Sequence, residues 1–268
     1  MDNHQLDLWA VRRSGINWWR FRRIIKQASS KSEGNTLVLF PEDTFSYKYK
    51  PCQVETELKK LSLDERTTLF FSVFEIDPEK ESKIHTRESL DKYDEELTAI
   101  YNEKLREQGL MGEDIYSNFG YIVFRTNGRV EWKKYRKFNT TQFDTINSRR
   151  PVKVRYCQRT NIKLIATTFT TENSVISPPQ ISVGGKTIEY KVCIDIINPS
   201  KLDSDLILCS AHGLNPENRQ VKGKLVLIND SERGILGYHD GKLVYGFQQC
   251  KELLNPNNIN FHLYKTIF

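Results

Sequence analysis

The sequence predicts an α/β fold built from two packed β-sheets that are flanked by helices. Strand-like and helix-like segments alternate over residues 1–76, and pairs of strand-like segments separated by turn residues follow them. A chain of 268 residues with 38% hydrophobic residues can bury one substantial core. Because no internal repeat and no linker rich in Pro, Gly or Ser divides the chain, we expect a single domain over residues 1–268.

The first elements are a short strand at residues 6–12 and a basic helix at residues 16–28. In the helix, Trp18, Phe21 and Ile25 recur at intervals of three and four residues, which places them on one face. Arginines interleaved with aromatic residues can bind nucleic acid or an anionic membrane surface. The periodic spacing instead favours a helix that turns its arginines toward solvent.

The later elements are read from apolar runs and turn residues. The pair Asn127–Gly128 is typical of a tight hairpin turn and joins expected strands at residues 121–125 and 130–135. Further strands are expected at residues 36–40, 67–76, 162–170, 188–193, 206–210, 224–228, 235–239 and 243–247, with a second helix at residues 53–63.

The segment at about residues 77–112 is densely charged. Its apolar residues recur at three and four positions over residues 86–108, which predicts a helix that Thr86 begins and Gly109 ends. This inserted helix is either a surface ornament or a lid or partner surface, because loops over the carboxyl edge of a sheet set specificity.

Three chemically useful side chains come where expected strands end. Glu42 follows residues 36–40 just past Pro41, Lys137 follows residues 130–135, and Cys193 ends residues 188–193. Open α/β sheets build their reactive sites at the carboxyl ends of strands. A carboxylate, an ammonium group and a thiol at such an edge supply a base, a cation and a nucleophile.

Three short motifs carry these residues in a fixed order. LVLFPE ends on Glu42, YRK ends on Lys137, and VCIDI contains Cys193, with DLILCSA following at residues 205–211. Together they resemble the nitrilase (carbon–nitrogen hydrolase) superfamily, of which the chain would be a divergent member. The resemblance implies a four-layer αββα sandwich, to which the charged segment at about 77–112 adds an inserted helix.

The chemistry of the residue types and the resemblance together suggest a role for each residue. Glu42 would act as general base, Lys137 would stabilise the oxyanion, and Cys193 would be the nucleophile. The backbone N–H of Ile194 would be a second oxyanion donor. Many family members carry a second glutamate, which Glu172 matches by its distance from Cys193. No metal or cofactor is implied.

The expected activity is a thiol-dependent amidohydrolase, a hydrolase of carbon–nitrogen bonds other than peptide bonds. It would cleave a non-peptide or terminal carboxamide through a thioester on Cys193, with either a small-molecule amide or a protein amide as substrate. The alternative is a catalytically inactive binding protein of the same fold that uses the charged insertion or the basic N-terminal helix.

Composition sets expectations for compartment and partners. No apolar stretch approaches the roughly 20 residues that span a bilayer, and residues 1–5 show no leader pattern. An odd number of cysteines, five, favours reduced thiols and a cytoplasmic location. We expect no nucleic-acid partner. The connections after Cys193 are short compared with the family, which predicts a monomer or an atypical homodimer.

Overall fold

The computed structural model describes residues 6–12, 14–42, 44–45, 49–76, 116–137, 179–197, 204–214, 225–231, 234–239, 242–245, 251–254 and 260–266. The charged segment with its expected helix, the expected strand at 162–170 and Glu172 lie outside these residues.

The larger of the two β-sheets has seven strands. They are β1 (Leu6–Val11), β2 (Asn35–Leu39), β3 (Thr67–Ile76), β4 (Tyr116–Thr126), β5 (Arg129–Arg136), β12 (Lys251–Leu254) and β13 (Asn260–Thr266). Their order in the sheet is β12-β13-β1-β2-β3-β4-β5. β1, β2 and β3 form a parallel triplet, and the strands on both sides of it pair antiparallel.

The smaller sheet has six strands and the same plan. They are β6 (Gln180–Val183), β7 (Lys186–Val192), β8 (Leu206–Ala211), β9 (Val226–Asp230), β10 (Gly234–His239) and β11 (Lys242–Tyr245). Their order is β11-β10-β9-β8-β7-β6, with β7, β8 and β9 as the parallel triplet. A short 3-10 helix, η1 (Cys193–Ile197), follows β7 directly.

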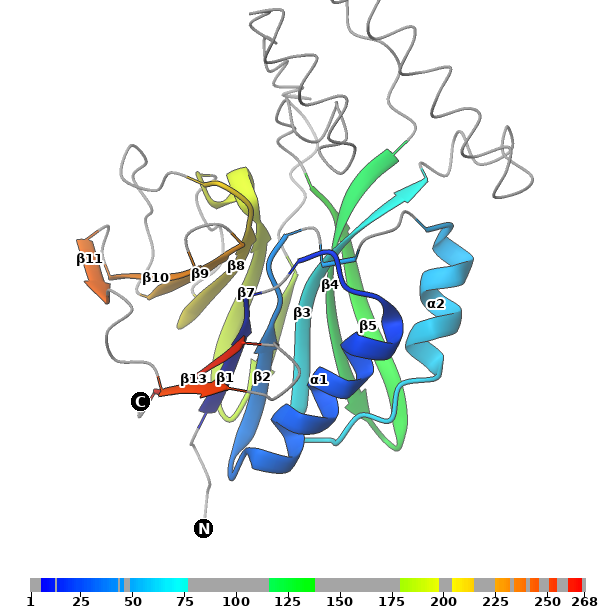
Figure 1. Cartoon of the computed structure of the whole chain (residues 1–268), viewed down its shortest axis with the longest axis horizontal. Coiled ribbons are helices and arrows are strands. Elements are labelled where there is room, and N and C mark those ends of the chain that lie inside the picture. The colour runs from blue at the N-terminus through cyan, green and yellow to red at the C-terminus, as the bar shows by residue number, and fades with distance from the viewer. Residues whose placement is uncertain are drawn as a thin grey trace, which may run out of the picture.

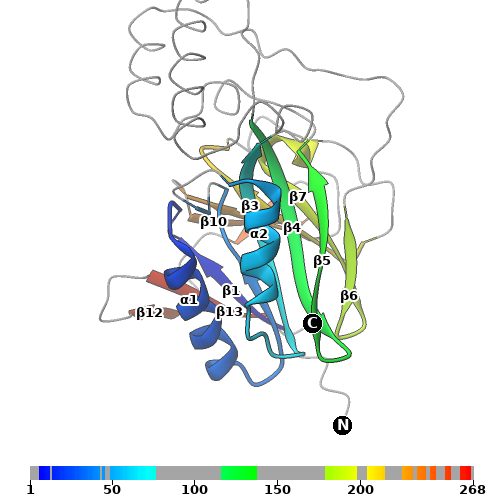
Figure 2. The same ribbon diagram turned by 90° about the vertical axis from the view of Figure 1, so that its right-hand side faces the viewer.

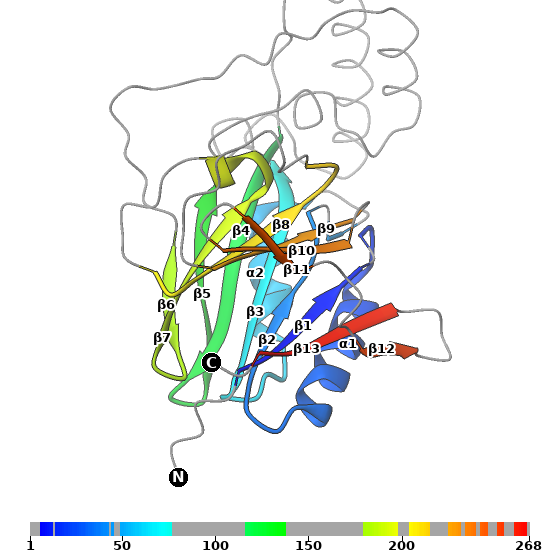
Figure 3. The same cartoon turned by 90° about the vertical axis from the view of Figure 1, so that its left-hand side faces the viewer.

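Two α-helices cover the outer face of the larger sheet. In α1 (Trp18–Lys31) the Asn17 side chain caps the start by accepting from the amide of Arg20 at 2.9 Å. In α2 (Pro51–Lys59) the start is set by Pro51, a residue favoured in the first turn. Figure 1 shows both helices on one side of the larger sheet and the smaller sheet on the other. Figure 2 views the helices face-on, and Figure 3 views the smaller sheet from the opposite side.

The alternation of side chains along the larger sheet separates two cores. On β3, Phe70 lies in the core between the sheets, whereas Leu69 and Phe71 lie in the core beneath the helices. The helix core also takes in Phe21 of α1 and Leu58 of α2. The larger sheet is therefore buried on both faces.

Polar side chains join the two sheets where their parallel triplets end. Asn229 of β9 donates from Nδ2 to the carbonyls of Val11 and Leu39 at 2.9 and 2.8 Å. Ser210 of β8 donates from Oγ to the carbonyl of Phe40. These bonds satisfy buried carbonyls at strand ends and hold the carboxyl ends of both triplets against each other.

The α/β class and the two packed sheets are confirmed, and the expected strands that fall on described residues are present within a few residues. The predicted bounds of the second helix were wrong, because the helix begins at Pro51 and ends at Lys59 rather than continuing to residue 63. After Lys59 the chain turns, and Leu61 and Leu63 pack into the helix core. Described residues supply one helical layer and both sheets, so the fourth layer of the expected sandwich remains a prediction.

Candidate active site

Glu42 lies just beyond the carboxyl end of β2 and links the two sheets. Its backbone N–H donates to the carbonyl of Ala211, the last residue of β8, at 3.3 Å. The residue is 5% exposed, so its carboxyl group is held between the sheets rather than in open solvent. The contact with Ala211 places it at the edge where both parallel triplets end.

Lys137 and Asn118 both contact Glu42 from the neighbouring antiparallel strands. Lys137 Nζ lies 2.8 Å from Glu42 Oε1, and Asn118 Nδ2 donates to the same oxygen at 2.7 Å. Phe119 pairs with Arg136 across β4 and β5, so Asn118 lies opposite Lys137, and the Lys137 amide donates to the Asn118 carbonyl at 2.8 Å. Residues directly opposite in a sheet project from the same face, which brings both side chains to Glu42.

The resulting ion pair is buried. Lys137 is 5% exposed and Asn118 is 4% exposed. A buried charge is tolerated when an opposite charge and hydrogen bonds compensate it, and here the lysine and the amide both act on one carboxylate oxygen. Lys137 and Asn118 thus place a cation and a hydrogen-bond donor against a carboxylate that is largely shielded from water.

Cys193 has an unusual backbone conformation at the end of β7. Its φ is 49°, in the left-handed region that residues other than glycine seldom adopt, and the residue is 6% exposed. The conformation turns the chain sharply from β7 into η1. Strained residues of this kind cluster at functional sites, and α/β-hydrolases present their nucleophile on a similar sharp strand-to-helix turn.

The pairing of β7 with β8 brings Cys193 to the same edge as Glu42. Val192 pairs with Ser210 in parallel strands, so the next residues, Cys193 and Ala211, leave the sheet side by side. Ala211 is the residue whose carbonyl accepts from the Glu42 amide. The three residues Glu42, Lys137 and Cys193 therefore follow three separate strand ends at the same edge of the two sheets.

A second cysteine lies beside Cys193. Cys209 on β8 donates from Sγ to the Cys193 carbonyl at 3.7 Å. Burial, with a smaller contribution from the negative charge of Glu42, raises the pKa of the Cys209 thiol far above its ordinary value. Cys209 is therefore suited to a structural role rather than to attack on a substrate.

Tyr190 and Ser210 form a polar link in the core next to these residues. Tyr190 Oη and Ser210 Oγ are 2.7 Å apart, and Ser210 also donates to the carbonyl of Phe40. Burial raises the pKa of the Tyr190 hydroxyl, so it stays protonated. The hydroxyl of Ser210 joins the sheets and is not positioned as a nucleophile.

Of the two remaining predicted site residues, the structure describes only one. The backbone of Ile194 belongs to η1, directly after the cysteine, whereas Glu172 lies outside the described residues. Asn118 was missed as a site residue in the sequence analysis. Its signal is a polar residue directly before the mainly apolar run at residues 119–124 of β4, but its contact with Glu42 depends on the pairing of β4 with β5.

Solved structures with a similar fold include amidases. A cysteine-to-serine mutant of the amidase from Nesterenkonia AN1, described as a member of the nitrilase superfamily, matches with a TM-score of 0.50 at 12% identity, covering 99% of this chain and 92% of that one. The fold is that of the nitrilase superfamily. A cysteine-to-alanine mutant of the Nesterenkonia amidase in complex with butyramide has a TM-score of 0.49 at 11% identity, covering 98% and 91%. A CN-hydrolase superfamily protein from Xanthomonas campestris, with an arsenic adduct in its active site, has a TM-score of 0.42 at 13% identity, covering 91% and 86%.

No protein-family model and no curated protein matches the chain. The likeness to the nitrilase fold is therefore seen in the three-dimensional structure, in which two sheets pack together and the carboxyl ends of their parallel strands meet. Of the helices in the described part of the chain, none combines the length and hydrophobicity that a membrane span requires.

Proposed function

We propose that the protein is a thiol-dependent amidohydrolase with Cys193 as nucleophile, Glu42 as general base and Lys137 as oxyanion-stabilising cation. The observation that carries the proposal is the buried Glu42–Lys137 ion pair at the sheet edge where Cys193 turns out of β7 with a left-handed backbone. Structural ion pairs and structural cysteines are common separately. Their combination at one edge of a nitrilase fold supports catalysis.

Each step of the proposed reaction uses one of these groups. The Cys193 sulfur attacks the amide carbon while its proton passes to Glu42. The carbonyl oxygen becomes negative in the tetrahedral intermediate, where Lys137 Nζ and the N–H of Ile194 stabilise it. Glu42 returns the proton to the departing ammonia or amine and leaves a thioester. It then takes a proton from water, which attacks the thioester and releases the carboxylic acid and the thiol.

The environment of Asn118 is an argument that the substrate is a primary carboxamide. Its Nδ2 is directed at Glu42, and its buried Oδ1 has no hydrogen-bond partner among the described residues. A buried acceptor of this kind is costly unless something satisfies it. We propose that it accepts from the N–H₂ of a carboxamide, which a small molecule or a protein side chain or terminus can supply.

The most direct test is intact-mass spectrometry after incubation with a pool of carboxamides. We expect an added acyl group on the wild-type chain, located at Cys193 by peptide mapping, and no adduct on Cys193→Ser. Glu42→Gln should accumulate the adduct or fail to form it, because the same carboxylate serves both half-reactions. Absence of any adduct or ammonia release from every amide would contradict the proposal.

A second test asks whether Glu42 activates the thiol. A small uncharged electrophile should label Cys193 about tenfold more slowly in Glu42→Gln than in the wild type, since general-base assistance is lost. Exposed Cys52 serves as an internal control, and Glu131→Gln makes the same chemical change at an exposed position on β5. Equal labelling of Cys193 in all three proteins would favour an inactive binding protein of the same fold.

A further inference from the structure

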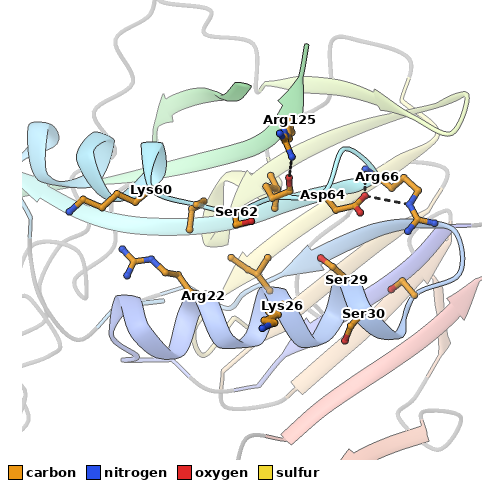
Figure 4. Close-up of a pocket in the computed structure, with 13 residues that line it drawn as sticks. Arg22, Lys26, Ser29, Ser30, Lys60, Ser62, Asp64, Arg66 and Arg125 are labelled. Carbon is orange, nitrogen blue, oxygen red and sulfur yellow. Dashed lines mark hydrogen bonds and ion pairs between the residues drawn. The ribbon is translucent and has the colours of Figure 1, made fainter. Parts of the chain in front are cut away.

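A groove of about 780 Å³ lies on the outer face of the larger sheet, far along the strands from the candidate active site. One wall is α1, and the other is the segment that leads from α2 into the start of β3 (Figure 4). Arg125, near the carboxyl end of antiparallel β4, lies behind them. Because β3 begins here and ends at the other edge, the groove is at the opposite end of the parallel strands from Glu42 and Cys193. Its lining consists of Arg22, Ile25, Lys26, Ser29, Ser30, Ser32, Lys60, Leu61, Ser62, Leu63, Asp64, Arg66 and Arg125.

The lining is strongly cationic. Five of its side chains are Arg or Lys, whereas Asp64 is its one carboxylate. Glu57, just outside the lining, forms ion pairs with Arg22 and Lys60. Even with Glu57 counted, cations exceed carboxylates by three. A positive excess of this size in a concave surface attracts multiply charged anions.

The guanidinium groups are held in place by contacts that use only part of their donor capacity. Arg125 donates from Nη1 to the carbonyl of Leu63 at 3.0 Å, and Arg66 donates from Nε to Asp64 at 3.4 Å. Asp64 in turn accepts from the Arg66 amide at 2.8 Å, which fixes the turn that leads into β3. Each guanidinium has five N–H groups, so donors remain for a ligand after these contacts are made. Positioned donors bind anions with less loss of side-chain entropy.

Lys26 adds a cation without an ion pair among the described residues. It lies on the groove side of α1, exposed to solvent. Ser29, Ser30 and Ser62 also line the groove (Figure 4). The Ser30 hydroxyl donates to the carbonyl of Gln27 at 3.0 Å, and Ser29 Oγ lies 2.9 Å from Thr67 Oγ1, where it can accept from Thr67 and donate to a ligand. Ser, Arg and Lys side chains are the usual donors to phosphate oxygens in proteins, with arginine forming paired hydrogen bonds.

We propose that this groove binds a ligand that carries at least two phosphoryl groups. Each phosphoryl group brings a charge of about −1.5 to −2 near neutral pH, so two of them match the excess of three cations, whereas a single carboxylate does not. The apolar side chains of Ile25, Leu61 and Leu63 supply a surface for the uncharged part of the ligand. The basic face of α1 is thereby half of a binding site and not merely a solvated surface.

The test is titration calorimetry of the whole chain with tripolyphosphate at low salt. Lys26→Glu should weaken binding about tenfold or more, because it removes one charge-assisted contact and adds a repulsive charge. Lys59→Glu is the matched control, since Lys59 is an exposed neighbour of Lys60 outside the groove, and should change the affinity less than twofold. Arg125→Lys, which keeps the charge and loses the planar fork, should also weaken binding.

Two ligand sources are separated by a sedimentation experiment. Retention on phosphatidylcholine vesicles that contain phosphatidylinositol bisphosphate, lost in Lys26→Glu, would point to a lipid headgroup. Binding of tripolyphosphate without vesicle retention would point to a soluble ligand, and both outcomes support the site. No binding of either probe, equal weakening by Lys26→Glu and Lys59→Glu, or equal binding of sulfate at matched ionic strength would overturn it. Labelling of Cys193 should be unchanged in Lys26→Glu, so failure here is distinct from failure of the proposed activity.

Discussion

Cys193 is held in a backbone conformation that its own side chain disfavours. At φ 49° the Cβ atom approaches the following carbonyl, which costs a residue other than glycine roughly 1–2 kcal/mol. Cys193 is held between the end of β7 and the 3-10 helix η1, so this conformation places its sulfur atom at the turn between them. The backbone strain therefore falls on the residue that we propose as the nucleophile.

We predict that at this position, unlike most, a glycine variant is more stable than an alanine variant. Cys193→Gly should be about 1 kcal/mol more stable than Cys193→Ala, because glycine adopts positive φ without the penalty. Urea unfolding of both variants measures the difference. Cys209 provides the control within regular strand β8, where Gly should be less stable than Ala. A Cys193→Gly variant clearly less stable than Cys193→Ala would show that the left-handed turn is not rigidly imposed.

Asn118 is expected to act as a positioning residue for Glu42. In Asn118→Leu the carboxylate loses a donor at 2.7 Å and keeps its contact with Lys137. Labelling of Cys193 by an uncharged electrophile should slow about tenfold, a change of about 1.4 kcal/mol that is close to the lower bound for a hydrogen bond to a charged group. The rate at exposed Cys52 should stay constant. An unchanged Cys193 rate would leave Asn118 with a purely structural role.

Local patterns could predict some residues and not others. Glu42, Lys137 and Cys193 stand at the ends of apolar runs, so a short stretch of sequence identifies each position. The contact of Asn118 with Glu42 requires the register between β4 and β5, and the link from Glu42 to Ala211 joins two sheets. Such long-range contacts leave little trace in the neighbouring sequence.

At the scale of elements, the strands β3, β4 and β5 enclose another buried acid, Glu75, which the proposed reaction does not use. Glu75 accepts from the hydroxyl of Tyr121 and from Lys134 Nζ on the outer face of the larger sheet. Burial raises the pKa of Glu75 above its ordinary value of 4.5, and the contacts with Lys134 and Tyr121 offset only part of this effect. The folded protein therefore favours the protonated carboxyl more than the unfolded chain does.

This shift predicts a pH dependence of stability. Since the folded state retains its proton to higher pH, the contribution of Glu75 is greatest below about pH 4.5 and is lost as the pH rises through the raised pKa. The free energy of unfolding of the wild type should therefore decline relative to that of Glu75→Gln as the pH rises above about 4.5. Urea unfolding across this range measures it. Glu131→Gln, the same change on the exposed side of β5, should parallel the wild type at every pH.

The strands that the sequence did not predict are peripheral or short. β6 is four residues long, and β12 and β13 lie at one edge of the larger sheet. β13 pairs with β1, so its position depends on a contact between the two ends of the chain. By contrast, the helical spacing of Trp18, Phe21 and Ile25 predicts their burial in α1 from local sequence alone.

For the whole molecule, the short connections of the smaller sheet bear on assembly. Only the five residues of η1 and the stretch up to Leu206 separate β7 from β8. Residues 193–205 are too few for a long helix. The resemblance to the superfamily implies that such helices build the interface between subunits, so we expect a smaller surface for self-association. We expect a monomer, or a dimer formed through other surfaces, in light scattering at micromolar concentration. Large oligomers under these conditions would contradict this expectation.

The junction between the sheets also means that neither half of the chain can hold the candidate site by itself. Glu42 and Lys137 come from the larger sheet, Cys193 comes from the smaller one, and β13 returns from the end of the chain to lie beside β1. A backbone cut between residues 137 and 179 would leave the base and the nucleophile on separate fragments. Reactivity at Cys193 would then report reassociation of the fragments, much as a split reporter signals the docking of its two parts.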